Sequence, residues 1–475
     1  MDEKKVLNTL LILLFICGTM IIFLTPPLSA PDEDRHFLNA YACSKGDFYI
    51  EKNPETGEWG KYYPAYILYF HKTFKGKFQG KLDEKISFSE VYPLSWQRVG
   101  EPARESEFLV GELWGVNNPW SFFFPAIGMK LWRLMGNLID QNLDTAYNLL
   151  LAGRFLNFLA FFCISTLAIK ITPFLKKTMI FLVSMPMTLF LSASLSYDAI
   201  VISVTFLLLA EVLSLIFVEE KKVKKIDMVI IGFCALFLTA IKPVYAPFFL
   251  LCFFIPQCKF GAKRNYIISI VIVMLAGILG FGIPSLINSL LSSASQGGES
   301  IFDAQKIYFL NHIFEFPQYI INSFKEFHSF YITSFFGNLG ALDTNYPVPF
   351  IVLCLLCLFI ISFTEISEIE GATWKLKAAN IIILIFVLLA TYGYIYLTWT
   401  PIVLGVGTDV ISGVQGRYFI PLYCFAILLF AFNGQKKLPQ VVNEQIKKYT
   451  CVFNYTICFF MIISVPIILL IRYWI

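Results

Sequence analysis

Long apolar stretches recur along this chain and constrain its fold more than any other feature. A backbone inside a bilayer must satisfy its own polar groups, so apolar stretches of this length favour membrane-spanning helices. The composition agrees, because 57% of the 475 residues are hydrophobic and only 15% are charged, against about 25% in soluble domains. The candidate spans are about 6–25, 148–170, 178–195, 198–218, 226–241, 244–257, 265–289, 347–364, 378–399, 417–432 and 451–473. We therefore expect an all-α polytopic membrane protein with about 11 transmembrane helices.

The distribution of basic residues predicts the orientation of these helices. Lysines and arginines gather in alternate loops, at Lys4-Lys5, Lys176-Lys177, Lys221–Lys225, Lys259–Arg264, Lys375–Lys377 and Lys436–Lys448. The short loops on the other side carry only Lys242 and Arg417. Because cytoplasmic loops are enriched in Lys and Arg, we expect a cytoplasmic N-terminus and functional loops on the extracytoplasmic side of the cell membrane.

This topology divides the chain into five parts. They are a first helix (1–25), a large extracytoplasmic loop (26–147), helices 2–7 (148–289), a second long extracytoplasmic loop (290–346) and helices 8–11 (347–475). The first loop is long enough to form a mixed cap with a small fold of its own. Between Trp120 and Met135, apolar residues recur at helical spacing, which is typical either of a helix in the membrane interface or of one packed on the cap.

Acidic residues follow the first span directly, within the string Pro31-Asp-Glu-Asp-Arg-His36. Carboxylates held at the membrane boundary can take a proton from a substrate whose lipid tail stays in the bilayer. The alternative is an ordinary solvated turn after a helix. Asp32 and Glu33 are thus candidate catalytic bases, with Asp34 as a further acid beside them. His36 would share a helical face with them and could orient a carboxylate or bind a sugar hydroxyl.

Further charges lie near the extracytoplasmic ends of other spans, at Asp198, Lys242 and Arg417. Lys and Arg form strong charge-assisted bonds to phosphate oxygens, so these residues could hold a phosphate group near the acids. The alternatives are snorkelling of Lys242 and Arg417 toward headgroups and helix capping by Asp198.

Cysteine and histidine spacing gives no metal signature. Most of the 11 cysteines lie inside apolar stretches, where Cys behaves as a small hydrophobic residue. We predict no metal ligands and no certain cofactor, and leave a divalent cation open.

Several short motifs, taken together, resemble the DUF2142-type family of bacterial multi-pass membrane proteins. They are Pro31-Asp-Glu-x-x-His36, Pro186–Ser194 ending at Asp198, Lys242-Pro-Val-Tyr245, Gly337–Asp343 and Gln415-Gly-Arg-Tyr-Phe-Ile-Pro421. This family is grouped with the GT-C glycosyltransferases, so the resemblance implies a GT-C-like architecture. It further implies a polyprenyl-phosphate sugar donor and an acidic base in the first outer loop, at Asp32 or Glu33. Candidate substrate-binding residues are His36, Arg35, Lys242, Tyr245, Arg417, Gln415, Asp198 and Asp343. The chain departs from the family pattern at Asp34-Arg35, which leaves the identity of the base open.

The sequence therefore predicts a membrane glycosyltransferase. Its partners would be a polyprenyl-phosphate sugar donor, a cell-envelope glycan or lipid acceptor and the bilayer, with no nucleic acid. Two alternatives stay open: a transporter or flippase of lipid-linked saccharides, and a non-catalytic envelope-assembly protein. A transporter would place its binding groups near the midplane, often between repeated halves, whereas this chain gathers its charges toward one face.

Overall fold

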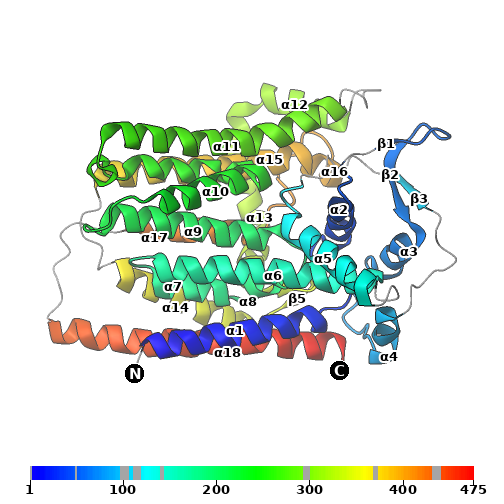
Figure 1. The fold of residues 1–475 in the computed structure, drawn as a ribbon, viewed down its shortest axis with the longest axis horizontal. Helices are drawn as coiled ribbons and strands as arrows, with labels where there is room; N and C mark the ends of the chain where they lie inside the picture. The colour runs from blue at the N-terminus through cyan, green and yellow to red at the C-terminus, as the bar shows by residue number, and fades with distance from the viewer. Residues whose placement is uncertain are drawn as a thin grey trace.

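Long apolar helices lie side by side in this protein, and a small mixed cap sits at one end of them (Figure 1). The computed structural model describes residues 3–48, 51–96, 106–110, 119–139, 144–292, 300–366, 373–430 and 440–475. Among these residues, seven helices are long and apolar enough to cross a membrane. They are α1 (Glu3–Leu24), α6 (Ala146–Ile171), α9 (Tyr197–Phe217), α11 (Lys263–Ser292), α14 (Val348–Ile366), α15 (Trp374–Thr398) and α18 (Gln440–Tyr473). The polytopic helical class is confirmed.

The other four expected spans are helical but shorter or broken, which corrects the expectation of about 11 full spans. They are α7 (Lys176–Ser184) with α8 (Pro186–Ser192), α10 (Lys225–Ile241), η3 (Pro243–Phe254) and η6 (Gly416–Phe419) with α17 (Ile420–Leu428). Proline explains the break between α7 and α8, because it disfavours helical backbone in the residue before it. Met185, which precedes Pro186, has extended angles of φ −59° and ψ 139°.

The cap is built from the chain that follows α1. Its elements are α2 (Glu33–Lys45), β1 (Glu51–Lys52), β2 (Trp59–Pro64), α3 (Ala65–Phe74), α4 (Phe88–Val91), η1 (Tyr92–Ser95), β3 (Ser106–Val110) and α5 (Phe123–Ile139). The strands form an antiparallel sheet in the order β1-β2-β3, with Tyr62 opposite Phe108. We call the end of the bundle that carries these elements the cap end (Figure 1).

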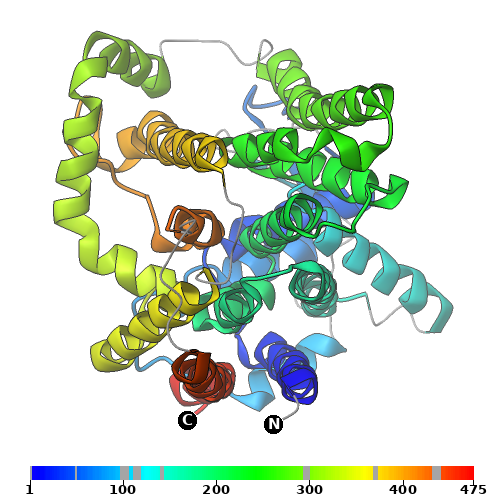
Figure 2. The ribbon, with the colours of Figure 1, turned by 90° about the vertical axis from the view of Figure 1, so that its left-hand side faces the viewer.

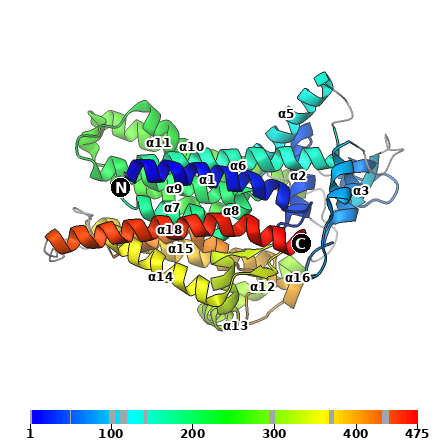
Figure 3. The same ribbon diagram turned by 90° about the horizontal axis from the view of Figure 1, so that it is seen from below.

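Helix α5 leaves the bundle at an angle (Figure 3). Near its start it packs tightly on α6, because a Cβ atom at Gly128 would overlap the carbonyl group of Ala152. Farther along, Leu131, Leu134 and Leu138 are exposed. The helix therefore packs at one end and presents apolar side chains at the other, and its place in a membrane interface stays a prediction.

The second long segment, expected as a loop, is mostly helical. Its described part contains α12 (Ile301–Asn311), η5 (Ile313–Glu315), α13 (Phe316–Phe336) and a hairpin of β4 (Asn338–Leu339) and β5 (Thr344–Asn345). Helix α13 runs across the long helices (Figures 1 and 2). Its Phe316 and Tyr331 pack with Tyr392 and Val414 in a separate hydrophobic cluster, which explains why this aromatic-rich segment is ordered as helix.

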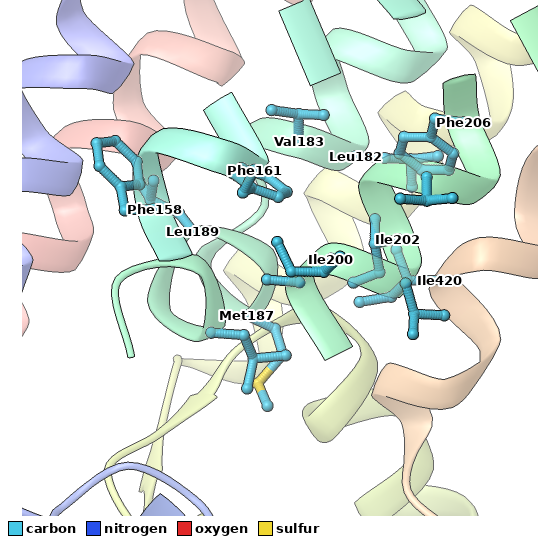
Figure 4. Packing of buried hydrophobic residues seen from close by; sticks show 14 of the residues in the cluster. Phe158, Phe161, Leu182, Val183, Met187, Leu189, Ile200, Ile202, Phe206 and Ile420 are labelled. Atoms are coloured by element: carbon cyan, nitrogen blue, oxygen red, sulfur yellow. The ribbon is translucent and has the colours of Figure 1, made fainter. Parts of the chain in front are cut away.

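Helix α9 lies at the centre of the bundle, and almost all of its residues are buried. Figure 4 shows Ile200, Ile202 and Phe206 of this helix among Phe161 and Ile420 of its neighbours. A helix surrounded on all sides needs no polar face, which accounts for its uniformly apolar sequence. Its first turn lies at the cap end, so Asp198 begins the central helix there.

The end of α18 is fastened to the cap by Arg472. Its guanidinium donates to four carbonyl oxygens of one cap segment, those of Phe78, Lys81, Leu82 and Glu84, at 2.9–3.2 Å. The Ile86 N–H also donates to the Tyr473 carbonyl (2.8 Å). Helix η4 (Gln257–Phe260) completes the chain between η3 and α11.

Candidate functional site

Four charged residues from distant parts of the chain meet at the cap end. Arg417 Nη2 lies 3.1 Å from Asp32 Oδ2, and Arg417 Nε lies 3.0 Å from Asp198 Oδ2. The other oxygen of Asp198 lies 2.5 Å from Lys242 Nζ. We call these residues, in the order Asp32, Arg417, Asp198 and Lys242, the ion-pair chain. Acids and cations thus alternate along it.

The two acids are presented at the starts of helices. Asp32 directly precedes α2 in a left-handed conformation (φ +59°), and its carbonyl accepts the N–H of His36 at 3.0 Å. Asp is one of the few residues that tolerate this backbone region. Asp198 lies in the first turn of α9, whose cap is Ser196. A helix N-terminus favours a carboxylate, so the local backbone stabilises Asp198 in its ionised form.

The two cations lie where short helices begin. Lys242 directly follows α10, and Pro243 turns the chain into η3. Arg417 belongs to η6, which is held against α13: the Gly416 N–H donates to Ser334 Oγ (2.8 Å). A Cβ atom at Gly416 would overlap the Tyr331 carbonyl oxygen, so only glycine allows this close approach.

Burial differs sharply along the ion-pair chain. The side chains of Arg417 and Asp198 are 3% and 9% exposed, that of Lys242 is 18% exposed and that of Asp32 is 48% exposed. Arg417 Nη1 has no hydrogen-bond partner among the residues that the structure describes. A buried donor without a partner is costly, at about 1–3 kcal/mol. This guanidinium is therefore suited to receive a further acceptor group.

Tyrosines surround Lys242. Its Nζ lies 4.0 Å from the centre of the Tyr418 ring and 5.5 Å from that of Tyr197, distances at which a cation is attracted by the ring face. The Tyr245 hydroxyl donates to the Tyr418 carbonyl oxygen (2.8 Å) and fixes this loop. Tyr418 and Tyr197 were not among the residues predicted from the sequence, although the Gln415-Gly-Arg-Tyr-Phe motif places Tyr418 directly after Arg417.

His36 lies beside Asp32 in an aromatic environment. Its ring centre is 5.0 Å from that of Tyr197 and 5.4 Å from that of Phe122. Burial lowers the pKa of His36 below its ordinary value of 6.5, although the Asp32 and Asp198 carboxylates oppose this effect. Nδ1 has no hydrogen-bond partner within the described ranges. A neutral imidazole with a free ring nitrogen can bind a hydroxyl group.

Glu33, expected as a second candidate base, is engaged elsewhere and is fully buried. Its oxygens accept from Arg154 Nε (2.8 Å) and Arg154 Nη2 (2.5 Å), and one also accepts the Leu195 N–H (3.2 Å). The remaining Arg154 donors bind the carbonyl oxygens of Ile22, Thr25 and Pro26. All five guanidinium donors are thereby used. These contacts and the burial favour a structural ion pair for Glu33, and its role as a base stays a prediction.

Asp34 points to a third set of partners. Its Oδ2 lies 3.8 Å from Lys75 Nζ and 4.0 Å from His71 Nε2, both on the cap. Of the three consecutive acids, only Asp32 therefore belongs to the ion-pair chain. The sequence could not separate the three, because their roles depend on partners far away in the chain.

The remaining candidates differ in position. Arg35 lies over the Trp399 ring at 5.7 Å, and Gln415 precedes η6 with its side-chain oxygen unpaired among the described residues. Asp343 is not part of the ion-pair chain: it accepts the Gly80 N–H (2.9 Å) and lies 3.7 Å from Arg472 Nη2. Its contacts join the β4–β5 hairpin to the cap, and its role in substrate binding stays a prediction.

No group of three or more His, Cys, Asp or Glu side chains is placed to hold a metal ion in the part of the chain that the structure describes. Both carboxylates of the ion-pair chain are already paired with cations.

Comparison with protein families shows where this chain belongs. The family described as Predicted membrane protein (DUF2142) matches residues 15–426, which include all four residues of the ion-pair chain. No curated protein and no solved structure matches this chain.

Proposed function

For this chain, which belongs to the DUF2142 family of predicted membrane proteins, we propose the function of a glycosyltransferase of GT-C type. It would transfer a sugar from a polyprenyl-phosphate donor to a cell-envelope glycan or lipid acceptor at the outer face of the membrane. The observation that carries the proposal is the ion-pair chain, in which the half-exposed Asp32 carboxylate pairs with the buried Arg417, and Asp198 links Arg417 to Lys242.

The proposed step is a single displacement at the anomeric carbon. Asp32 accepts the proton of an acceptor hydroxyl, and the acceptor oxygen bonds to that carbon. The bond between the carbon and the phosphate oxygen breaks, and its electron pair leaves with the polyprenyl phosphate. Arg417 and Lys242 stabilise the negative charge that develops on the leaving phosphate. Because attack and departure occur on opposite faces, the anomeric configuration is inverted.

The surroundings of the ion-pair chain support a substrate of this kind. His36 and the tyrosines near Lys242 offer a polar nitrogen and ring faces to a sugar. A lipid tail can extend among the exposed apolar residues of the long helices. The N-terminus, where Glu3 pairs with Lys177 at 3.7 Å, lies at the end of the bundle away from the cap (Figure 1), which supports the proposed cytoplasmic N-terminus and outer cap.

The test compares cell-envelope glycans of four strains by mass spectrometry: wild type, deletion, Asp32→Asn and Asp34→Asn. We expect one sugar to be missing in the deletion and Asp32→Asn strains and to be retained in the Asp34→Asn strain. Asp34→Asn removes the same charge two residues away, outside the ion-pair chain. Western blots of membrane fractions ensure equal amounts of each variant.

Two results would count against the proposal. Unchanged glycans in the deletion strain would exclude a role in glycan synthesis. A complete lipid-linked saccharide that accumulates on the cytoplasmic side would instead support the transporter.

A further inference from the structure

We propose that Asp32 acts as an internal substitute for a substrate phosphodiester on Arg417, and that binding of this group releases Asp32. The phosphodiester would belong to a prenyl-linked substrate. This inference rests on the proposed function and adds to it the order of events: the base becomes free only after the donor phosphate has bound.

The charges of the ion-pair chain leave room for one anion. Arg417 and Lys242 carry two positive charges, and Asp198 contributes one negative charge to both. One positive charge then remains, which Asp32 balances in this structure. Glu33 and Arg154 do not alter this balance, because they neutralise each other at 2.5 Å. Buried charges are stable only when paired, so the replacement for Asp32 must be a single negative charge.

A phosphodiester carries one negative charge, whereas a diphosphate carries at least two. The balance therefore favours a sugar linked to a prenyl chain through one phosphate. A diphosphate-linked saccharide would leave excess negative charge beside the Asp198 carboxylate.

The geometry identifies Asp32 as the partner that can leave. Its side chain is 48% exposed, whereas Asp198 is 9% exposed and contacts both cations. Asp32 also lies outside the helices, in the turn before α2. Withdrawal of Asp32 breaks one half-exposed ion pair, but withdrawal of Asp198 would leave two cations without a shared partner.

Arg417 is prepared for two-point binding of an oxyanion. Its Nη2 is held by Asp32, and its Nη1 is buried without a hydrogen-bond partner in the described part of the chain. Arginine binds phosphate through two parallel N–H groups. A phosphodiester has two non-bridging oxygens and can satisfy both nitrogens at once, which Asp32 does not do in this structure.

The test measures binding, without an acceptor, by the purified full-length protein in nanodiscs of zwitterionic lipid. The probe is farnesyl methyl phosphate, a prenyl phosphodiester with one negative charge. Asp32→Asn removes the competing charge, and asparagine tolerates the left-handed backbone of this position. We expect the variant to bind the probe about two- to fivefold more tightly than wild type, the range for a lost half-exposed ion pair.

Three controls test whether tighter binding arises from the release of Arg417. Asp34→Asn makes the same change in net charge two residues away and should leave affinity unchanged. The double variant Asp32→Asn/Arg417→Ala should not bind the probe more tightly than wild type, because the Arg417 guanidinium that binds the phosphate is absent. The increase in affinity caused by Asp32→Asn should be smaller for farnesyl diphosphate than for the phosphodiester. An equal increase for inorganic phosphate would show that the site binds free phosphate rather than a lipid.

Unchanged or weaker binding of the probe by Asp32→Asn would refute the inference. An equal increase in affinity for the probe in Asp34→Asn would refute it as well. Asp32→Gly serves as a second variant if Asp32→Asn is not monodisperse. The two proposals fail separately. If Asp32→Asn binds the probe more tightly but its strain has normal envelope glycans, only the glycosyltransferase proposal is refuted. If that strain loses glycosylation but the variant binds the probe as wild type does, only the replacement of Asp32 by the phosphodiester is refuted.

Discussion

Replacement of Glu33 by glutamine tests the structural role of the buried ion pair with Arg154. Both side chains are fully buried, and the shortest distance between them is 2.5 Å. Glutamine keeps the shape but removes the charge, so the Arg154 guanidinium stays buried without its counter-ion. Breaking a buried pair in this way costs about 3–5 kcal/mol.

This cost can be converted to a melting temperature. For 475 residues, an unfolding entropy of about 2.1 cal/mol/K per residue sums to about 1 kcal/mol/K. Glu33→Gln should therefore lower the melting temperature by about 3–5 °C. The assay is the loss of the monodisperse peak in fluorescence-detected size-exclusion chromatography after heating.

Glu90→Gln is the matched control. Glu90 is 49% exposed and lies 3.0 Å from Lys77. Exposed pairs contribute about 1 kcal/mol or less, so this variant should melt within about 1 °C of wild type. Equal shifts for the two variants would refute the reasoning. Normal melting with lost glycan transfer in Glu33→Gln would support Glu33 as the catalytic base.

Three further predictions concern other parts of the site and cap. Gly416→Ala should displace η6 from the Tyr331 carbonyl and weaken binding of farnesyl methyl phosphate, measured in nanodiscs. Burial lowers the pKa of His36, so this residue binds fewer protons in the folded than in the unfolded protein. The stability of the protein should therefore fall as the pH drops below about 6.5. His36→Gln should reduce the difference in melting temperature between pH 7 and pH 5. Arg472→Ala leaves four carbonyl oxygens without their donor, so limited proteolysis should cut residues 75–96 faster than in wild type.

The helical class and most helix positions could be predicted from the sequence, because apolar length is a local property. The break at Pro186 was missed, because residues 178–195 were expected to form one span, although proline acts locally on its immediate neighbour. The helix α13 was missed because its aromatic residues are stabilised by Tyr392 and Val414, which lie far along the chain. Hydropathy alone does not distinguish such a helix from a polar loop.

The candidate site was only partly predictable for a related reason. Charges near one face of the membrane suggested that Asp32, Asp198, Lys242 and Arg417 share a layer, and the structure brings them into contact. The sequence around Asp32, Glu33 and Asp34 does not indicate which partner each of these acids has in the structure. Glu33 pairs with Arg154, which is 121 residues away in the chain, whereas Asp32 pairs with Arg417.

The bonds between Arg472 and the cap have a consequence for biosynthesis. Arg472 and Lys81 are separated by 391 residues, so the early segment must wait for its partner to leave the ribosome. At about 5–20 residues per second this interval is about 20–80 s. Throughout that time the four carbonyl groups lack the Arg472 donor, so this part of the cap reaches its final packing only after α18 has been made.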